Sequence, residues 1–229
     1  MDITSANSKN LRVWDLPTRV FHWALAICVI LLVITGSMGG DKMQLHLTLG
    51  SWVLSLLIFR LIWGFVGGYW SRFVQFFYMP WTILRYLRGE TKPEHDIGHN
   101  PLGSLSVWSL LCILGAQVAT GLIGDDEIAT QGPLVKFVSG STSLIATSYH
   151  KHWGKWIIIA LVCLHVAAIL FYLFKKKENL IRPMLHGDKH IEAQSELTAA
   201  KDGAAQRITA LAIFIVIALG VAYTVQRLG

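Results

Sequence analysis

Apolar residues occur along this chain in five long segments separated by polar stretches. The segments run roughly over residues 20–37, 45–66, 102–124, 150–174 and 208–225. Each is close to the about 20 residues that a helix needs to cross the hydrocarbon core of a bilayer. Because lipid cannot complete backbone hydrogen bonds, each segment is expected to be helical. The pattern predicts an all-α integral membrane bundle of five spans.

The composition supports a membrane protein and argues against a nucleic-acid partner. Of the 229 residues, 53% are hydrophobic and 15% are charged, whereas soluble domains usually carry about 25% charged residues. The net charge is +6, but the Lys and Arg residues lie between the apolar segments. No basic face with interleaved aromatic residues is present, so membrane lipid is the expected partner and nucleic acid is not.

The distribution of positive charge predicts the orientation of the chain in the membrane. With five spans, the N-terminus and the polar stretches after the second and fourth spans share one side. That side holds most of the Lys and Arg residues, including Arg12, Arg72, Lys175 and Arg207. Positively charged loops stay in the cytoplasm. We therefore expect a multi-pass protein of the bacterial inner membrane with a cytoplasmic N-terminus and a periplasmic C-terminus.

Two polar stretches have features of their own. Residues 72–88 carry aromatic and leucine residues at helical spacing with arginines among them, which predicts an amphipathic segment in the cytoplasmic interface. Pro80 is expected to kink or restart it. Residues 175–207 are polar, and we expect them to be partly mobile.

Five histidines lie in or at the ends of the spans: His22, His46, His150, His152 and His165. Ionisable residues inside spans are rare and usually have a function. His22 and His165 fall near the cytoplasmic ends of their helices, and His46 lies at the opposite end, as do His150 and His152. Two imidazoles from facing helices can fill both axial positions of a haem iron. The pattern predicts one haem between His22 and His165, and another between His46 and either His150 or His152.

The spacing of these histidines indicates electron transfer. His150 and His165 are fifteen residues apart, or about 22 Å along a helix, so the two haems would lie near opposite faces of the membrane. Filling both axial positions leaves no place for oxygen to bind. The four remaining histidines, including His95 and His99, are expected to be solvated.

Small and basic residues near the histidines are candidates for haem contact. Gly50 and Gly154 each follow a histidine by four residues and share its helix face, so they could admit a flat macrocycle. Gly36, Gly115 and Gly121 are assigned to helix–helix packing. Arg19 is a candidate donor to a haem propionate, with Arg12 beside it and Lys151 or Lys155 at the other end. Each of these charges could instead serve topology or extend to the interface.

Several blocks of sequence resemble a known family. They are residues 12–23 (RVWDLPTRVFHW), 46–50 (HLTLG), 59–67 (FRLIWGFVG), 98–103 (GHNPLG) and 177–184 (KENLIRPM). Over roughly residues 11–187, the chain resembles bacterial cytochrome b561 proteins and the cytochrome b subunits of nickel–iron hydrogenases.

The resemblance implies a four-helix core that holds two b-type haems, with ligands on the first, second and fourth helices. These would be His22, His46, His165 and one histidine at the start of the fourth helix. The resemblance also implies electron exchange with the quinone pool and with a redox subunit, often a c-type cytochrome.

The chain departs from the family pattern in two places. The family's two ligands on the fourth helix are usually fourteen residues apart, whereas His150 lies fifteen residues before His165 and His152 lies thirteen before it. We prefer His150, because a π-bulge can absorb one extra residue. The fifth span is not required by the four-helix core, so we divide the chain into a haem domain, residues 1–187, and a linker with the fifth helix, residues 188–229.

Other functions are compatible with the same residues. The protein could act alone as an oxidoreductase on quinone or superoxide, and turnover with quinone alone would favour this. It could be a histidine-based ion or metal transporter, which predicts that no haem absorption is seen. It could also be a passive anchor for a redox complex.

Overall fold

A computed structural model of the chain describes residues 8–91, 95, 97–128, 130–192 and 197–228. It confirms the predicted all-α membrane bundle. Within these residues, five helical segments are long and apolar enough to cross a membrane. They are Leu16–Met38, Gly40–Val66, Pro101–Ile123, Gly140–Lys176 and Ala204–Leu228.

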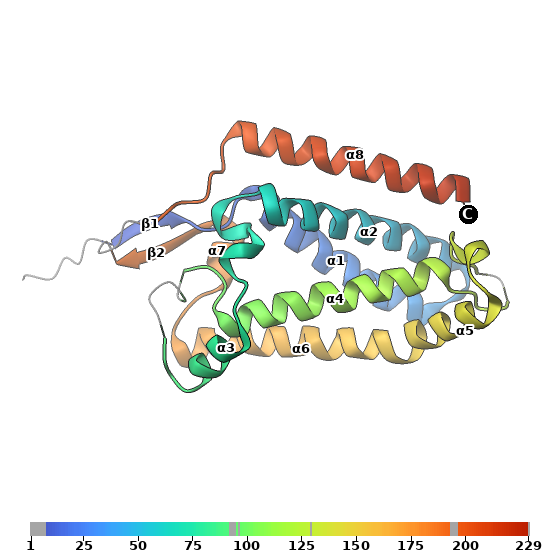
Figure 1. Ribbon diagram of the computed structural model, residues 1–229, viewed down its shortest axis with the longest axis horizontal. Helices are drawn as coiled ribbons and strands as arrows, with labels where there is room; N and C mark the ends of the chain where they lie inside the picture. Colours follow the sequence, from blue (N-terminus) through green and yellow to red (C-terminus); the bar gives the residue numbers. More distant parts are fainter. Residues whose placement is uncertain (1–7, 92–94, 96, 129, 193–196, 229) are drawn as a thin grey trace, which may run out of the picture. The chain divides into compact units, whose positions relative to one another are not determined.

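Shorter elements lie between these helices (Figure 1). In chain order, the structure contains β1 (Ser8–Arg12), α1 (Leu16–Met38), η1 (Gly40–Lys42), α2 (Met43–Val66), η2 (Tyr69–Ser71), η3 (Phe73–Gln75), α3 (Pro80–Leu87), α4 (Pro101–Ile123), η5 (Val135–Phe137), α5 (Gly140–Ser148), the π-helix η6 (Tyr149–Gly154), α6 (Lys155–Phe171), the π-helix η7 (Tyr172–Lys176), α7 (Ile181–His186), β2 (Asp188–Glu192) and α8 (Ala204–Leu228).

The chain divides into two compact units. The first unit consists of Met1–Val20, Ile62–Val107 and Val166–Ala210. The second consists of Phe21–Leu61, Trp108–His165 and Leu211–Gly229.

A buried aspartate organises the first unit. Asp15, the residue before α1, is fully buried and caps that helix by accepting a 2.8 Å hydrogen bond from the Thr18 amide. Its carboxylate also accepts hydrogen bonds from Trp63 Nε1, the Gly68 amide and Ser71 Oγ, at 3.1, 2.9 and 2.9 Å. Four donors satisfy the buried charge, so the carboxylate fixes the start of α1 against the end of α2.

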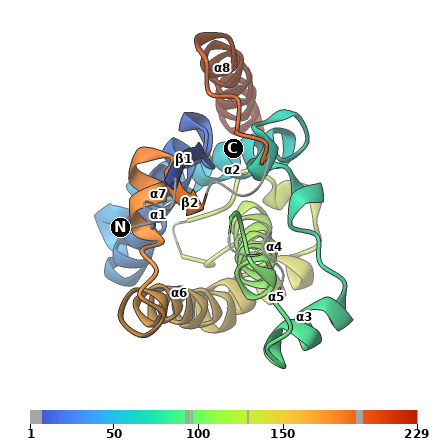
Figure 2. The ribbon, with the colours of Figure 1, turned by 90° about the vertical axis from the view of Figure 1, so that its left-hand side faces the viewer.

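The first unit also contains a two-stranded antiparallel sheet that sequence patterning did not predict. β1 pairs with β2, with Asn10 opposite His190, and the two strands lie side by side in Figures 1 and 2. Gly187 ends α7 in the left-handed conformation, with a φ of 93°. Its carbonyl oxygen accepts hydrogen bonds from the backbone amides of Val13 and Trp14. The polar stretch after the fourth span therefore includes ordered structure.

The second unit is built around a helical core. Buried side chains from α2, α4 and α6 pack together with partly buried residues of α1, and Figure 2 looks along these helices. They include Val53, Leu57, Leu114 and Ile158. Phe214 of α8 stacks on Trp52 of α2 at 6.2 Å between ring centroids, so aromatic contacts hold the fifth span against the second.

The fourth span begins about ten residues earlier than predicted. Residues 140–148 form α5, which continues without a break into η6 and α6. Ser139 caps α5, because its hydroxyl accepts a hydrogen bond from the Thr142 amide at 3.2 Å. The apolar run of the sequence placed the start of this span near residue 150, whereas the helix begins directly after the capping serine.

The aromatic segment at residues 72–88 restarts as expected at Pro80, which is the first residue of α3. Before Pro80, Phe73 and Phe76 are buried and Phe77 is exposed, and Trp81 directly after it is exposed as well. This alternation divides the segment into an inward aromatic side and an outward one.

Candidate functional site

The second unit brings the side chains of His46 of α2 and His150 of η6 close to each other. Their ring centroids are 6.1 Å apart with an interplanar angle of 77°, and both side chains are half-buried. His152 is exposed. Of the two candidates for the fourth ligand, the structure places His150 opposite His46.

Backbone carbonyls orient both of these imidazoles. His46 Nδ1 lies 3.1 Å from the Leu32 carbonyl oxygen, and His150 Nδ1 lies 2.9 Å from the Gln117 carbonyl oxygen. A carbonyl can only accept, so Nδ1 must carry the proton in each ring. This tautomer leaves Nε2 with a free lone pair, as a metal ligand requires.

His22 of α1 and His165 of α6 form a second pair in the same unit. Their ring centroids are 6.4 Å apart, with an interplanar angle of 50°. His22 Nδ1 is buried and has no hydrogen-bond partner among the residues that the structure describes. The Trp23 ring meets the His22 ring edge-on at 5.0 Å.

Both pairs have the spacing of two imidazoles that share one metal ion. An imidazole nitrogen binds a metal at about 2.0–2.1 Å, so two rings on opposite sides of one ion have centres about 6–6.5 Å apart. The observed separations, 6.1 and 6.4 Å, fall within this range. In the described part of the chain, no three His, Cys, Asp or Glu side chains come together. Haem iron needs only two protein ligands when both are axial, so these histidines fit that group.

Two glycines that the sequence assigned to helix packing lie directly against this site. A Cβ atom on Gly36 would lie 2.9 Å from His46 Cε1, and one on Gly121 would lie 3.0 Å from His150 Cε1. Each glycine follows a threonine, Thr35 or Thr120, so a Thr-Gly dipeptide occurs in both spans that face the rings. The repeated Thr-Gly dipeptide was the sequence feature that could have identified these two glycines as neighbours of the histidines.

The glycines proposed to admit a macrocycle have different surroundings. A Cβ on Gly50 would meet nothing within 4 Å, so the helix face beside His46 is open there. A Cβ on Gly154 would overlap Gln117 Oε1. Gly154 therefore allows α4 to approach η6 closely, while Gly50 leaves open space on the face of α2 beside His46.

The turn that carries His150 is a π-helix, η6, as expected from the extra residue between the two histidines of this span. Gln117 of α4 donates from Nε2 to the His150 carbonyl at 3.1 Å. The Gln117 backbone carbonyl also accepts the hydrogen bond from His150 Nδ1. Gln117 therefore contacts His150 through both its side chain and its backbone.

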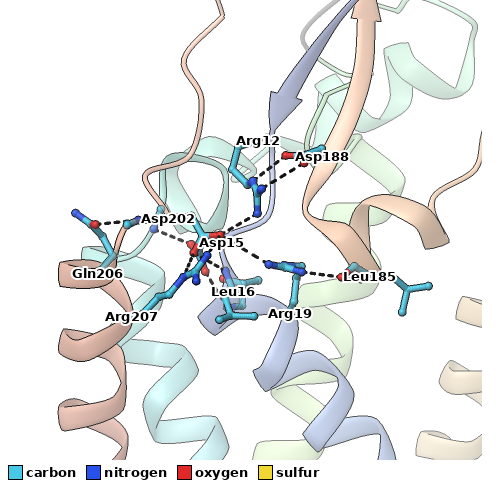
Figure 3. Close-up of polar contacts among 12 residues, drawn as sticks. Arg12, Asp15, Leu16, Arg19, Leu185, Asp188, Asp202, Gln206 and Arg207 are labelled. Atoms are coloured by element: carbon cyan, nitrogen blue, oxygen red, sulfur yellow. Dashed lines mark hydrogen bonds and ion pairs between the residues drawn. The ribbon is translucent and has the colours of Figure 1, made fainter.

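The arginines predicted to meet propionates belong to a charged network in the first unit (Figure 3). Arg19 Nη1 donates to the Leu185 carbonyl at 2.6 Å, and Nη2 lies 3.7 Å from Asp202. Arg12 pairs with Asp202 at 2.9 Å and with Asp188 at 2.7 Å. Arg19 thus contacts the end of α7, Arg12 contacts the start of β2, and both contact the segment that precedes α8.

Asp202 is the centre of this network. Its side chain is 6% exposed, and it also accepts from Arg207 and from the Leu16 amide at 3.1 and 3.0 Å. Burial alone would raise the pKa of Asp202, but the hydrogen bonds from Arg207 and Leu16, with the charges of Arg207 and Arg12, outweigh it. The pKa of Asp202 is therefore below its usual value.

Other basic candidates occupy varied positions. Arg60, a further arginine within the second span, is 3% exposed, so its side chain is buried. Lys151 is exposed, and the Lys155 ammonium lies 5.0 Å from the centre of the Trp156 ring.

Two histidines expected in solvent are instead packed among aromatic rings. His95 is 6% exposed and meets the rings of Tyr78 and Tyr86 at 5.5 and 5.6 Å. His99 lies 4.6 Å from the Phe76 ring. The expectation of solvation was wrong because the residue 72–88 segment supplies aromatic side chains that surround these histidines.

A helical membrane bundle with facing histidines inside it is the architecture of an integral membrane haem protein. Comparison with known families agrees with this class. Residues 13–187 match the family described as prokaryotic cytochrome b561. The chain belongs to this family of b-type cytochromes, which implies a b-type haem and electron transfer in the membrane.

Several curated relatives are similar to most of the chain. A probable Ni/Fe-hydrogenase 1 B-type cytochrome subunit of Escherichia coli (strain K12) is 26% identical over 223 residues, covering 82% of this chain and 94% of that protein. Probable Ni/Fe-hydrogenase B-type cytochrome subunits are similar too: that of Azotobacter vinelandii is 27% identical over 213 residues, with 76% and 86% coverage. That of Bradyrhizobium diazoefficiens is 24% identical over 212 residues, with 77% and 85% coverage.

Proposed function

We propose that the chain holds two b-type haems, one between His46 and His150 and one between His22 and His165. Its function is to transfer electrons across the membrane between quinone and a redox partner. The observation that carries this proposal is that two pairs of histidines face each other at 6.1 and 6.4 Å, the separation that one axially bound iron requires. A haem with both axial positions filled supplies one-electron transfer and offers no open position to oxygen.

The chain's own residues supply ligation, orientation and spacing. The carbonyls of Leu32 and Gln117 hold two of the imidazoles in the tautomer that exposes Nε2. His150 and His165 lie fifteen residues apart on one continuous helical segment, which separates the two pairs by about 22 Å along the helix.

The relatives' names suggest a particular redox partner. They are cytochrome subunits of Ni/Fe-hydrogenases, so we propose the catalytic subunits of such an enzyme as the partner, with a c-type cytochrome as the alternative. In membranes that contain both proteins, hydrogen would reduce the cytochrome in the first case. Reduction only by a c-type cytochrome would support the second.

We also propose that the protein lies in the bacterial inner membrane with its N-terminus in the cytoplasm and its C-terminus in the periplasm. The positive charge after the second and fourth spans supports this orientation. A reporter that is active only in the periplasm, fused after Gly229, should be active. Activity of a cytoplasmic reporter at that position would reverse the assignment.

Paired alanine variants test the haem sites. The double variants His46→Ala/His150→Ala and His22→Ala/His165→Ala should each lose one haem per chain and keep the other. His186→Ala removes an exposed histidine of α7 and is the matched control, which should keep both. Retention of two haems by either double variant would contradict the ligand assignment.

The same preparations separate the alternative functions. A histidine-based transporter would show no haem absorption and a metal-dependent flux. A protein that turns over quinone or superoxide without any partner would be an oxidoreductase in its own right.

A further inference from the structure

The same three groups, a backbone carbonyl, a threonine and a glycine, contact each ring of the His46–His150 pair, from a different helix in each case. On α1 the contacting groups are the Leu32 carbonyl, Thr35 and Gly36. On α4 they are the Gln117 carbonyl, Thr120 and Gly121. In both helices the carbonyl comes three residues before the threonine, and the glycine follows the threonine directly.

The threonine hydroxyl of α1 is fixed by its own helix. Thr35 Oγ1 donates to the Leu31 carbonyl at 2.7 Å, and it lies 3.2 Å from His46 Nδ1. Because its proton is committed to the backbone, the hydroxyl offers only a lone pair to the ring. His46 Nδ1–H therefore meets two acceptors, the Leu32 carbonyl at 3.1 Å and the hydroxyl.

The threonine of α4 has an equivalent position. Thr120 Oγ1 donates to the Ala116 carbonyl at 2.8 Å and lies 3.4 Å from His150 Nδ1. The Gln117 carbonyl is closer to that nitrogen, at 2.9 Å. The hydroxyl therefore contributes less to His150 than Thr35 contributes to His46.

The glycine after each threonine makes these contacts possible. With any larger residue at Gly36 or Gly121, the added Cβ would lie 2.9–3.0 Å from the ring. The ring would then have to shift from its position against the acceptors. Each of the two helices thus presents a hydroxyl and a carbonyl to the Nδ1 atom of one histidine. The glycine leaves room for the edge of the ring.

We propose that Thr35 and Thr120 are positioning residues that hold His46 and His150 in the Nδ1–H tautomer and lower the reduction potential of the haem bound between them. This inference rests on the proposed function. An imidazole whose Nδ1–H donates to strong acceptors is a more basic ligand through Nε2, and a more basic ligand favours the oxidised iron.

The other pair gives an internal comparison. His22 Nδ1 has no hydrogen-bond partner within the described residues, so no equivalent device acts on that imidazole. Replacement of the threonines should change one of the two redox transitions and leave the other as it was.

The test is a potentiometric titration of the purified full-length holoprotein with Thr35→Val, Thr120→Val or both. Valine keeps the shape of threonine and removes the acceptor. The control is Thr48→Val, because Thr48 makes the same type of bond to its own helix, to the Gln44 carbonyl at 2.9 Å, and is exposed. Haem is counted per chain in every variant.

We expect two haems per chain in each variant and a shift of one transition to higher potential. The shift should be larger for Thr35→Val than for Thr120→Val, largest for the double variant and absent for Thr48→Val. Unchanged transitions with both haems bound would overturn the proposal while leaving the proposed function intact. A wild-type protein without haem would instead overturn the proposed function.

A serine variant covers the case in which valine causes loss of haem. Thr35→Ser keeps the hydroxyl. Retention of haem and potential by serine, with loss by valine, would support the role of the hydroxyl. Equal loss in both variants would show that the hydroxyl alone does not retain the haem or set its potential, and would overturn the proposal.

Discussion

Gly36 and Gly121 are the positions at which the smallest change should disturb the site. A Cβ atom at either would lie 2.9–3.0 Å from a histidine ring carbon, so the ring must shift. We expect Gly36→Ala and Gly121→Ala each to destabilise the holoprotein by about 1–3 kcal/mol, as overpacking usually does. They should also reduce haem occupancy of the His46–His150 pair. Thermal unfolding and haem content measure both effects.

Gly115 provides the matched control for these glycine variants. It lies on α4, and a Cβ there would meet nothing within 4 Å. Gly115→Ala should therefore leave haem content unchanged and increase stability slightly, because alanine favours a helix by about 1 kcal/mol over glycine. Equal haem loss at all three positions would mean that contact with the rings is not the cause.

The choice between His150 and His152 can be tested directly. His150 faces His46 at 6.1 Å, whereas His152 is exposed. We expect His150→Ala to reduce haem content from two to one per chain and His152→Ala to leave it at two. The reverse result would move the ligand to His152.

The pairing of the histidines at two depths could be predicted from sequence, because the depth of a residue along a span follows from counting residues. Their immediate surroundings could not. Many threonines in helices donate to their own backbone, as Thr48 does, and only packing shows that Thr35 also faces a ring. Likewise, burial of His95 depends on the rings of Tyr78 and Tyr86, which local polarity does not reveal.

At the scale of elements, one carboxylate makes several of the contacts that hold the segment before α8. Asp202 contacts Arg12, Arg207 and the Leu16 amide. Replacing it with asparagine removes the charge and leaves buried donors poorly paired, at a cost of about 1–3 kcal/mol. We expect Asp202→Asn to lower the thermal unfolding temperature and to make the peptide bonds between β2 and α8 more accessible to a protease. Unchanged melting and cleavage would show that the network contributes no stability.

The lowered pKa of Asp202 also predicts a pH dependence. A carboxyl group with a lower pKa in the folded protein stabilises it fully above the unfolded value of about 3.9, and this contribution falls as the pH drops toward the folded pKa. The stability difference between wild type and Asp202→Asn should be constant near neutral pH and narrow below about pH 4. A difference that closes above about pH 5, or that grows on acidification, would contradict this account.

Other elements show where pattern analysis reaches its limit. The five spans follow from apolar runs, but the pairing of β1 with β2 joins residues as distant as Ser8 and Glu192, which local patterns do not link. The early start of the fourth helical segment depends on the Ser139 cap. The division into a haem domain and a separate fifth-helix segment at residue 187 stays a prediction.

For the whole molecule, family membership and the facing histidines both indicate haem binding. The family match covers residues 13–187 and implies a b-type haem. The facing pairs, His46 with His150 and His22 with His165, suggest how many haems there are and where they bind. The number of haems is therefore the quantity on which the account depends.

The most direct test is to count haem per chain in the purified wild-type protein and to record its reduced-minus-oxidised spectrum and redox titration. The account predicts two b-type haems per chain that titrate in two one-electron steps, with no high-spin signal from an open axial position. A single haem, or none in cells supplied with ample haem, would contradict the two-pair arrangement.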